Sequence, residues 1–320
     1  MLKIATQMDG WYDHHDPEGS FAFIKSCGFD AIDFPIDIPV NEMAKSKECG
    51  PYESFFDKST EEILAHFAPM KAAAERHGIT FCQAHGPDKL WFPEREELNE
   101  YLIGVYEKSF ALCAFLNIPA IVVHPIQRPT KEEDFACNMA AYKRLIPFAK
   151  KYGVKICLEN LFVHRAFMAM GLEAPASDAA EACRYVDILN EIAGEDLFGF
   201  CFDVGHAILL RRNIKEFIKA LGKRLTILHI HENDGRYDEH SLPYTGVCDW
   251  NGTRACDWDG FVDGLREIGY RGALSFEVFR LNAYFPRRVW PELFRLVSAI
   301  GRDWSDRICG NEDSSLRVAR

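Results

Sequence analysis

The sequence predicts a single-domain α/β fold, a (β/α)8 TIM barrel, from three observations. Eight short apolar segments recur along the 320 residues, stretches with helical spacing separate them, and no GxGxxG or GxxxxGK[ST] nucleotide loop occurs. Eight strand–helix units typically occupy about 250 residues, so the length suits a barrel. A doubly wound open sheet is the competing fold, and it would normally carry such a loop.

The expected strands are nearly continuous apolar runs, which are typical of strands buried on both faces in a parallel sheet. They cover residues 2–8, 31–36, 80–86, 120–125, 155–161, 198–207, 225–233 and 273–279.

Two of the intervening segments carry clear helix signals. Ser59 and Glu62 form a capping-box pair, and Gly78 follows the apolar positions of that segment. A second pair, Thr130 and Glu133, opens the segment that ends near residue 152. We expect a helix in each segment, because this pairing satisfies free backbone N–H groups and glycine commonly ends a helix.

Extra length lies in three connections, and each of them follows an expected strand. They are residues 38–57, 162–177 and 234–257. Barrel enzymes build their active sites on this side of the strands. We expect the barrel to span residues 1–303 and residues 304–320 to form a polar, partly disordered C-terminal tail.

Composition excludes several classes of function. The net charge is −11, so neither nucleic acid nor an anionic membrane surface is expected as a partner. No apolar run is long enough to span a bilayer, and the first residues lack the pattern of a secretory signal. The cysteines number 11, without a Cys-x-x-Cys pair, which suits buried free thiols and a cytoplasmic location.

Polar side chains collect at the carboxyl ends of the expected strands and in the loops that follow. Because these ends meet at one mouth of a barrel, we expect the side chains to converge in space. They are His85, His124, Glu159, Asp203, His206, His229, His231, Asp238, His240 and Glu277.

Three of these carboxylates indicate a metal site. Glu159 and Glu277 lie inside apolar runs, where an unpaired carboxylate is costly to bury and a cation would remove the cost. Asp203 is similar, although it could instead cap a following helix. With His231 they form a donor set rich in oxygen, which favours Mn²⁺, Mg²⁺ or Co²⁺, with Zn²⁺ as a further alternative. We therefore expect one divalent metal ion held by these four residues.

Two other histidines have alternative interpretations. His229 and His231 alternate along one strand and therefore face the same side. We assign the ligand role to His231, which lies nearer the mouth, and expect His229 to orient a ligand or to belong to the core. His206 either contacts the substrate or lies exposed at the start of a helix.

Several motifs resemble the xylose isomerase-like superfamily of barrels, which contains sugar and sugar phosphate isomerases and epimerases and also endonuclease IV. The resemblance covers nearly the whole chain. Its most specific segments are CLEN, CFDVGHA, HIHEND…DEHSLP and DWDGFVDGLREIGYRGALSFE.

The resemblance implies roles for individual residues. In the ketose 3-epimerases of this superfamily, one metal is held at the positions of Glu159, Asp203, His231 and Glu277, and the two glutamates act as the acid/base pair. His206 corresponds to a histidine that contacts the sugar, and Arg236 is the nearest counterpart of a substrate-binding arginine. The remaining residues expected to line the substrate pocket are His85, His124, Asp238 and His240.

The predicted function is a divalent-metal-dependent isomerase or epimerase of a sugar, sugar phosphate or inosose. One glutamate would remove a proton beside a carbonyl, a metal-stabilised enediolate would form, and the other glutamate would return a proton. The resemblance also allows a homo-oligomer.

Three alternatives stay open. All nine ligands of the three zinc ions in endonuclease IV have a counterpart here, so a trinuclear phosphodiesterase is one, and the acidic charge is the reason to prefer the sugar. A lyase or dehydratase of the same superfamily is the second. A sugar-binding barrel without catalysis is the third.

Overall fold

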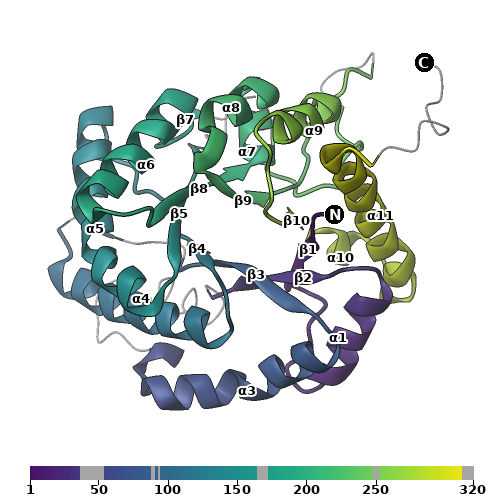
Figure 1. The fold of residues 1–320 in the computed structure, drawn as a ribbon, viewed down its shortest axis with the longest axis horizontal. Coiled ribbons are helices and arrows are strands. Elements are labelled where there is room, and N and C mark those ends of the chain that lie inside the picture. Colours follow the sequence, from purple (N-terminus) through teal and green to yellow (C-terminus); the bar gives the residue numbers. More distant parts are fainter. Residues whose placement is uncertain (37–53, 88–90, 93, 164–171, 248–251, 312–320) are drawn as a thin grey trace.

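Eight parallel strands form a ring, and helices surround it on the outside (Figure 1). The computed structural model describes residues 1–36, 54–87, 91–92, 94–163, 172–247 and 252–311. The ring strands are β1 (Ile4–Gln7), β2 (Ala31–Pro35), β3 (Thr80–His85), β4 (Ala120–Val122), β5 (Lys155–Glu159), β8 (Phe198–Asp203), β9 (Leu225–His229) and β10 (Leu274–Phe276). The predicted (β/α)8 fold is therefore confirmed.

The strands follow one another around the ring in chain order. Seven neighbouring pairs form parallel ladders, in the order β10–β1–β2–β3–β4–β5–β8–β9. The seam between β9 and β10 is closed by a single bridge between Ile230 and Phe276. There the Ile230 N–H donates to the Ser275 carbonyl at 2.9 Å and the Glu277 N–H donates to the Ile230 carbonyl at 3.0 Å.

The helices connect successive strands and cover the outer face of the barrel. They are α1 (Pro17–Ser26), α3 (Thr60–Arg76), α4 (Glu96–Phe115), α5 (Lys131–Tyr152), α6 (Ala179–Ala193), α7 (Val204–Leu209), α8 (Ile214–Leu221), α9 (Trp258–Glu267), α10 (Leu281–Tyr284) and α11 (Trp290–Cys309). Within the described residues, three short 3-10 turns accompany them, η1 (Phe55–Asp57), η2 (Gly222–Arg224) and η3 (Arg287–Val289).

Both predicted capping boxes are present. Ser59 accepts the N–H of Glu62 at the start of α3, and Thr130 accepts the N–H of Glu133 at the start of α5. In each case the glutamate side chain accepts the N–H of the capping residue in return. The helix starts read from the sequence are thus confirmed.

The sixth apolar run, residues 198–207, covers a strand that ends at Asp203, as expected, and the start of a helix. β8 ends at Asp203, and α7 begins at the next residue. The reason is local, because the Asp203 side chain accepts the N–H of His206 and so caps a helix.

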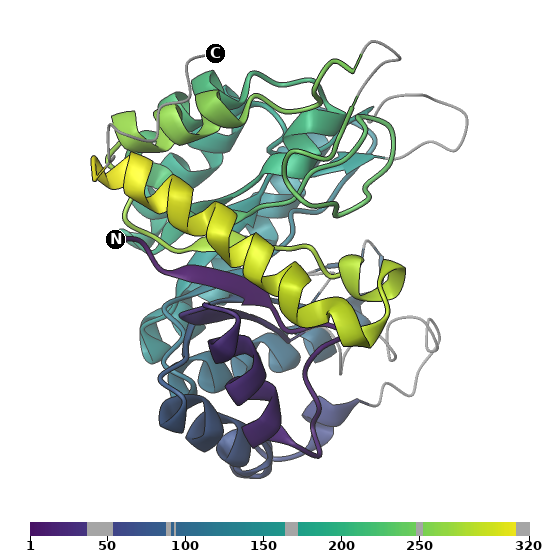
Figure 2. The ribbon, with the colours of Figure 1, turned by 90° about the vertical axis from the view of Figure 1, so that its right-hand side faces the viewer.

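The last helix also runs past the boundary expected at residue 303. α11 continues to Cys309, and the side chains of Trp304 and Ile308 are buried. Figure 2 shows this helix in yellow, lying across β1. Residues 304–309 therefore belong to a packed helix, while residues 312–320 of the expected tail lie outside the described residues.

Of the three long connections, residues 38–53, 164–171 and 248–251 lie outside the described part of the chain. The described ends of the second connection form a short antiparallel pair, β6 (Phe162–Val163) and β7 (Leu172–Glu173). Within the described residues no helix combines the length and apolar character needed to cross a membrane. The described cysteines are all free thiols, as expected, and Cys49 and Cys248 lie outside that set.

The core has two parts. Large apolar side chains fill the space between the strands and the helices, whereas the barrel interior takes small ones, because eight strands leave little room inside. These small and medium interior groups form two clusters of buried residues, Ala5, Ala31 and Ala273 in one and Ala120, Val122, Cys157, Cys201 and Ile227 in the other. Polar side chains also lie on the ring strands, and they form the site described next.

Candidate metal and active site

The four expected metal ligands all lie at the carboxyl ends of strands. Glu159 is the last residue of β5 and Asp203 the last of β8, while His231 lies two residues after β9 and Glu277 directly after β10. All four are buried, with exposed fractions of 1%, 0%, 0% and 8%. The barrel mouth therefore collects three carboxylates that are largely shielded from water.

His229 lies in the middle of these carboxylates. Its Nδ1 is 3.2 Å from Glu159, 3.4 Å from Glu277 and 3.9 Å from Asp203. On the other side of the ring, Nε2 is 3.3 Å from the carboxylate of Asp33 on β2. His229 thus contacts three of the four expected ligands. This placement favours the interpretation that it orients a ligand over the interpretation that it is a core residue.

The second histidine of the strand-end pair, His231, contacts Asp203 directly. Its Nε2 lies 3.2 Å from that carboxylate. A Cβ at Gly205 would overlap the imidazole of His231, so only glycine leaves room for this ring. The close approach of His231 therefore explains why a glycine stands at position 205, between Asp203 and His206.

Asn160 fixes the Asp203 peptide from the neighbouring strand. Its amide accepts the Asp203 N–H and donates to the Asp203 carbonyl, both at 2.8 Å. The carbonyl of Asn160 lies 2.9 Å from Nδ1 of His206. This one side chain and its own peptide thus position two of the predicted site residues.

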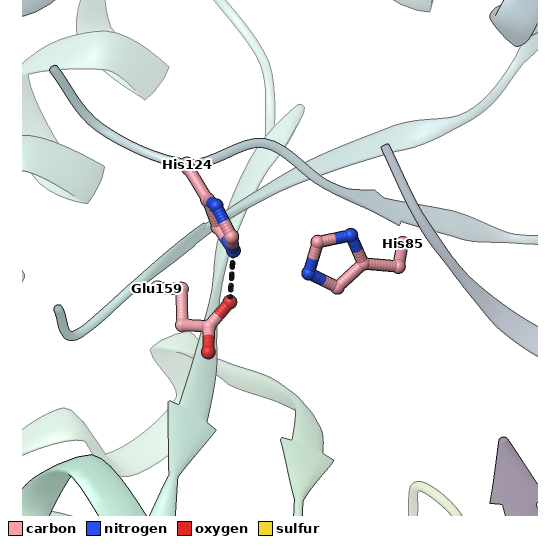
Figure 3. Close-up of side chains that lie close together, drawn as sticks. All are labelled: His85, His124 and Glu159. Carbon is pink, nitrogen blue, oxygen red and sulfur yellow. Dashed lines mark hydrogen bonds and ion pairs between the residues drawn. The ribbon is translucent and has the colours of Figure 1, made fainter. Parts of the chain in front are cut away.

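The outer histidines on β3 and after β4 lie beside Glu159. His124 Nε2 is 3.0 Å from the Glu159 carboxylate, and the rings of His85 and His124 meet edge to face at 4.6 Å (Figure 3). These two histidines and Glu159 each present a ligand atom within 4.8 Å of the others.

We call His85, His124, His206, Asp238 and His240 the outer ring, because they lie around the four expected ligands. Its other members, His206, Asp238 and His240, lie near His231. His240 stacks on the His231 ring with centroids 4.0 Å apart, and its Nδ1 lies 3.4 Å from Asp238. Asp238 is also 3.9 Å from Nε2 of His206. The structure therefore brings His85, His124, His206, Asp238 and His240 to the same mouth as the four expected ligands.

Arg236 is placed differently. Its side chain is exposed and lines a separate cavity with Arg211, Arg212 and Arg254. Among the described residues, none of the four expected metal ligands makes a hydrogen bond or ion pair with Arg236.

The carboxylates of the mouth differ in proton affinity. Burial disfavours the charge on Glu159, but His229 and His124 outweigh it and hold the pKa of Glu159 well below its usual range. Burial also opposes ionisation of Asp203, and His206 and His231 lower its pKa nonetheless. Burial raises the pKa of Glu277 to about 8, against the opposing effect of His229. Two glutamates of one site thus have pKa values shifted in opposite directions.

Three of the histidines that face these carboxylates, His206, His229 and His231, have raised pKa values, whereas burial lowers the pKa of His240 to about 3. Burial lowers the pKa of His206 and His231, but the charge of Asp203 outweighs it and raises them to about 10 and about 9. The neighbouring Cys201 and the carboxylates likewise raise the pKa of His229 above its ordinary value despite burial. Protons on these rings balance the buried negative charge.

The donor set fits a divalent cation. Ligand atoms of Asp203, His229 and Glu277 lie within 4.8 Å of one another, and the same is true of Asp203, His206 and His231. Buried carboxylates and imidazoles are the ligands that Mn²⁺, Co²⁺ and Zn²⁺ take in proteins. Such a cation could balance the charge that the histidine protons now balance.

Two residues of the site, Asp33 and Asn160, were not predicted from the sequence. Asp33 lies within the apolar run AIDFPI and is 2% exposed, and it accepts a hydrogen bond from Gln83 at 2.7 Å. A carboxylate inside an apolar run is the signal that singled out Glu159 and Glu277, so it could have found Asp33 too. Asn160 lies in the CLEN segment, but its contact with Asp203 joins residues 43 positions apart.

The chain is similar to proteins of known family. Residues 21–300 match the family model described as xylose isomerase-like TIM barrel. The inosose isomerase of Bacillus velezensis is 28% identical over 203 residues, which are 61% of this chain and 66% of that protein, just under two thirds. The ketose 3-epimerase of Arthrobacter globiformis is 22% identical over 308 residues, 95% of this chain and 91% of that protein.

Solved structures share the fold. A D-tagatose 3-epimerase-like protein matches with a TM-score of 0.68 at 18% identity, covering 97% of this chain and 99% of that one. The IOLI protein with a bound zinc atom matches with a TM-score of 0.63 at 19% identity, over 98% and 100% of the two chains. The family model covers most of the sequence, and the chain therefore belongs to the xylose isomerase-like TIM barrel family.

Proposed function

We propose that the protein is a divalent-metal-dependent isomerase or epimerase of a small carbohydrate: a ketose, an inosose or a sugar phosphate. The observation that carries this proposal is the pair of buried glutamates, Glu159 and Glu277, whose pKa values are shifted in opposite directions at one metal-binding mouth. Titratable pairs of this kind suit a reaction that removes and returns a proton. Relatives named inosose isomerase and ketose 3-epimerase support the substrate class.

Glu159, Asp203, His231 and Glu277 would hold the cation, and His229 is close enough to three of them to orient their carboxylates. When bound, Mn²⁺, Mg²⁺, Co²⁺ or Zn²⁺ would polarise the substrate carbonyl and acidify the adjacent C–H. The IOLI protein, whose solved structure shares the fold, has a bound zinc atom, which supports the proposal of a divalent metal.

The two glutamates divide the proton transfer. Glu277, whose pKa is about 8 without a cation and falls when one binds, exchanges one proton as a general acid or base. Glu159 stays ionised beside His124 and His229 and serves as the partner that exchanges the second proton. Their roles are reversed between the forward and backward directions.

The outer ring supplies hydrogen bonds to the substrate hydroxyl groups. We assign this role to the side chains of His85, His124, His206, Asp238 and His240. Phe162, whose ring centroid is 4.9 Å from that of His206, offers an apolar surface beside them.

Solvent exchange tests the proposal directly. In D2O, the purified protein with a divalent metal should incorporate deuterium at the carbon beside the carbonyl of a ketose or inosose. Glu159→Gln and Glu277→Gln should each reduce the exchange by at least about 100-fold, since a general base contributes about that much. Glu132→Gln, a change at an exposed glutamate of α5, is the matched control and should exchange at the normal rate.

If both variants exchange at the normal rate, the assignment of the two glutamates is wrong. If no ketose or inosose exchanges with the unaltered protein, the proposed activity is wrong. A product of lower mass than its substrate would instead identify a lyase or dehydratase.

One observation favours a second candidate, a phosphodiesterase with three metal ions. Three groups of three ligand atoms, each within 4.8 Å, involve His85, His124 and Glu159, then Asp203, His206 and His231, then His231, Asp238 and His240. About three zinc ions per chain and cleavage of an abasic DNA duplex would support it. One ion per chain and no cleavage would leave the isomerase.

A further inference from the structure

A cavity of about 580 Å³ is lined by four arginines, which lie in the segments that follow β8 and β9. Arg211 and Arg212 come from the connection between α7 and α8, Arg236 from the loop after β9, and Arg254 from the segment before α9. We call it the arginine cavity. Such a concentration of positive charge is unusual in a chain whose net charge is −11.

Two of these guanidinium groups have partners on the protein. Arg212 pairs with Glu173 at 2.5 Å and donates to the Ser177 carbonyl at 3.0 Å. Arg254 donates to the Tyr244 carbonyl at 2.8 Å. In contrast, the side chains of Arg211 and Arg236 make no hydrogen bond or ion pair within the described ranges. Their donors therefore face the cavity or the solvent.

The acidic residues of the cavity wall are already engaged. Asp234 accepts the backbone N–H groups of Arg236 and Tyr237, at 2.8 and 3.1 Å. Asp257 caps α9 by accepting the N–H of Gly260 at 2.9 Å. With Glu173, which pairs with Arg212, three carboxylates lie against four guanidinium groups. The cavity wall keeps an excess of positive charge.

The start of α8 adds to this excess. Its capping residue, Asn213, and its first residue, Ile214, both line the cavity. The cap is a neutral amide, so the helix start keeps a partial positive charge, which Glu216 in the first turn offsets in part.

We propose that the arginine cavity binds a phosphate group. Arginine side chains present planar pairs of N–H donors that match the oxygens of phosphate, and four of them from three segments line this one cavity. The phosphate group belongs either to a phosphorylated substrate that also reaches the metal site or to a separate phosphate-bearing molecule. Binding at this cavity does not depend on the proposed isomerase activity.

Titration with inorganic phosphate tests the proposal. The probe is added to the purified full-length protein at low salt, and heat is measured by calorimetry. Arg211→Gln combined with Arg254→Gln should weaken phosphate binding by about 10-fold or more. Arg236 is left unchanged, which confines the charge removal to the connection between α7 and α8 and the segment before α9.

The matched control removes two arginines elsewhere. Arg266→Gln combined with Arg295→Gln deletes the same charge from exposed pairs on α9 and α11, and it should leave phosphate binding within about twofold. Equal weakening in both double variants would show a general charge effect and overturn the proposal. Failure of the unaltered protein to bind phosphate would overturn it as well.

Kinetics then separate the two sources of the phosphate. If the cavity holds the substrate's own phosphate, the cavity variant raises KM for a ketose phosphate but not for the free ketose. If it holds a separate molecule, KM stays the same for both while phosphate binding is still lost. Metal content and deuterium exchange with free ketose, measured alongside, report on the proposed function independently of either result.

Discussion

His229 stands between Asp33 and the metal-site carboxylates, with Nε2 3.3 Å from Asp33 and Nδ1 3.2 Å from Glu159. The imidazole is 1% exposed, so its orientation depends on these contacts and not on water. Asp33 is itself held by Gln83 at 2.7 Å. A carboxylate inside the barrel therefore controls the ring that faces Glu159.

Asp33→Asn should weaken divalent metal binding by about 10-fold, because groups that orient the residues around a metal typically change its affinity by 10- to 100-fold. The substitution keeps the side-chain shape but removes the charge that faces His229. Competition with a chromogenic chelator measures the affinity. Asp187→Asn, at an exposed ion pair with Arg224, is the control and should bind metal normally. Normal binding by the Asp33 variant would contradict the role given to Asp33.

Gly205→Ala should displace the ring of His231 and reduce metal affinity by about 10-fold or more, as loss of a well-placed ligand does. The added methyl group would occupy the space of that imidazole. Gly104→Ala on α4 is the matched control, because a Cβ there meets no atom within 4 Å. Calorimetric titration with Mn²⁺ compares the variants, and an unchanged affinity for Gly205→Ala would show that His231 is not a ligand.

Metal affinity should fall as the pH is lowered. His231 and Glu277, with pKa values of about 9 and about 8, carry protons below those values and must lose them to bind a cation. Between pH 8 and pH 6, we therefore expect about a tenfold loss of affinity per pH unit for each proton displaced. Above about pH 9 the dependence should level off. Titrations in buffers of different ionisation enthalpy count the protons released, and a release of none would refute this.

Trp304→Ala should destabilise the fold by about 3–5 kcal/mol, the usual cost of removing a buried large aromatic side chain. The Trp304 ring stacks on Trp258 with centroids 4.9 Å apart, and its Nε1–H donates to the Tyr244 hydroxyl at 2.8 Å. Leu296→Ala, at a position of the same helix that is 49% exposed, is the control and should cost less than about 1 kcal/mol. Urea unfolding gives both values, and equal costs would mean that Trp304 contributes no buried packing.

The strands and the site residues at their ends could be predicted because both are local features. A carboxylate within an apolar run, such as Glu159 or Glu277, is visible in a few residues of sequence. The apolar run that contains β8 continues into α7, and the capping contact between Asp203 and His206 marks the strand end that was expected at Asp203. The expected tail was wrong about residues 304–309, although Trp304 and Ile308 show the four-residue spacing of a buried helix face.

Contacts between distant segments could not be predicted from the sequence. The central position of His229 depends on carboxylates from β2, β5 and β10, and no local pattern records how those strands align. Arg236 has the right residue type and nearly the right spacing for substrate contact, yet the loop carries it to a different cavity. The four arginines of that cavity are scattered over 44 positions, from Arg211 to Arg254, and become a cluster only through folding.

The single bridge that closes the barrel has a mechanical consequence. Ile230 and Phe276 form it, and His231 and Glu277 are the next residues in the chain. Two expected ligands therefore lie on opposite sides of the junction between β9 and β10. A cation bound by both residues would cross-link the two strands at this junction. Hydrogen exchange at the amides of Ile230 and Glu277 would then slow on metal binding more than exchange in the broad ladder between β5 and β8.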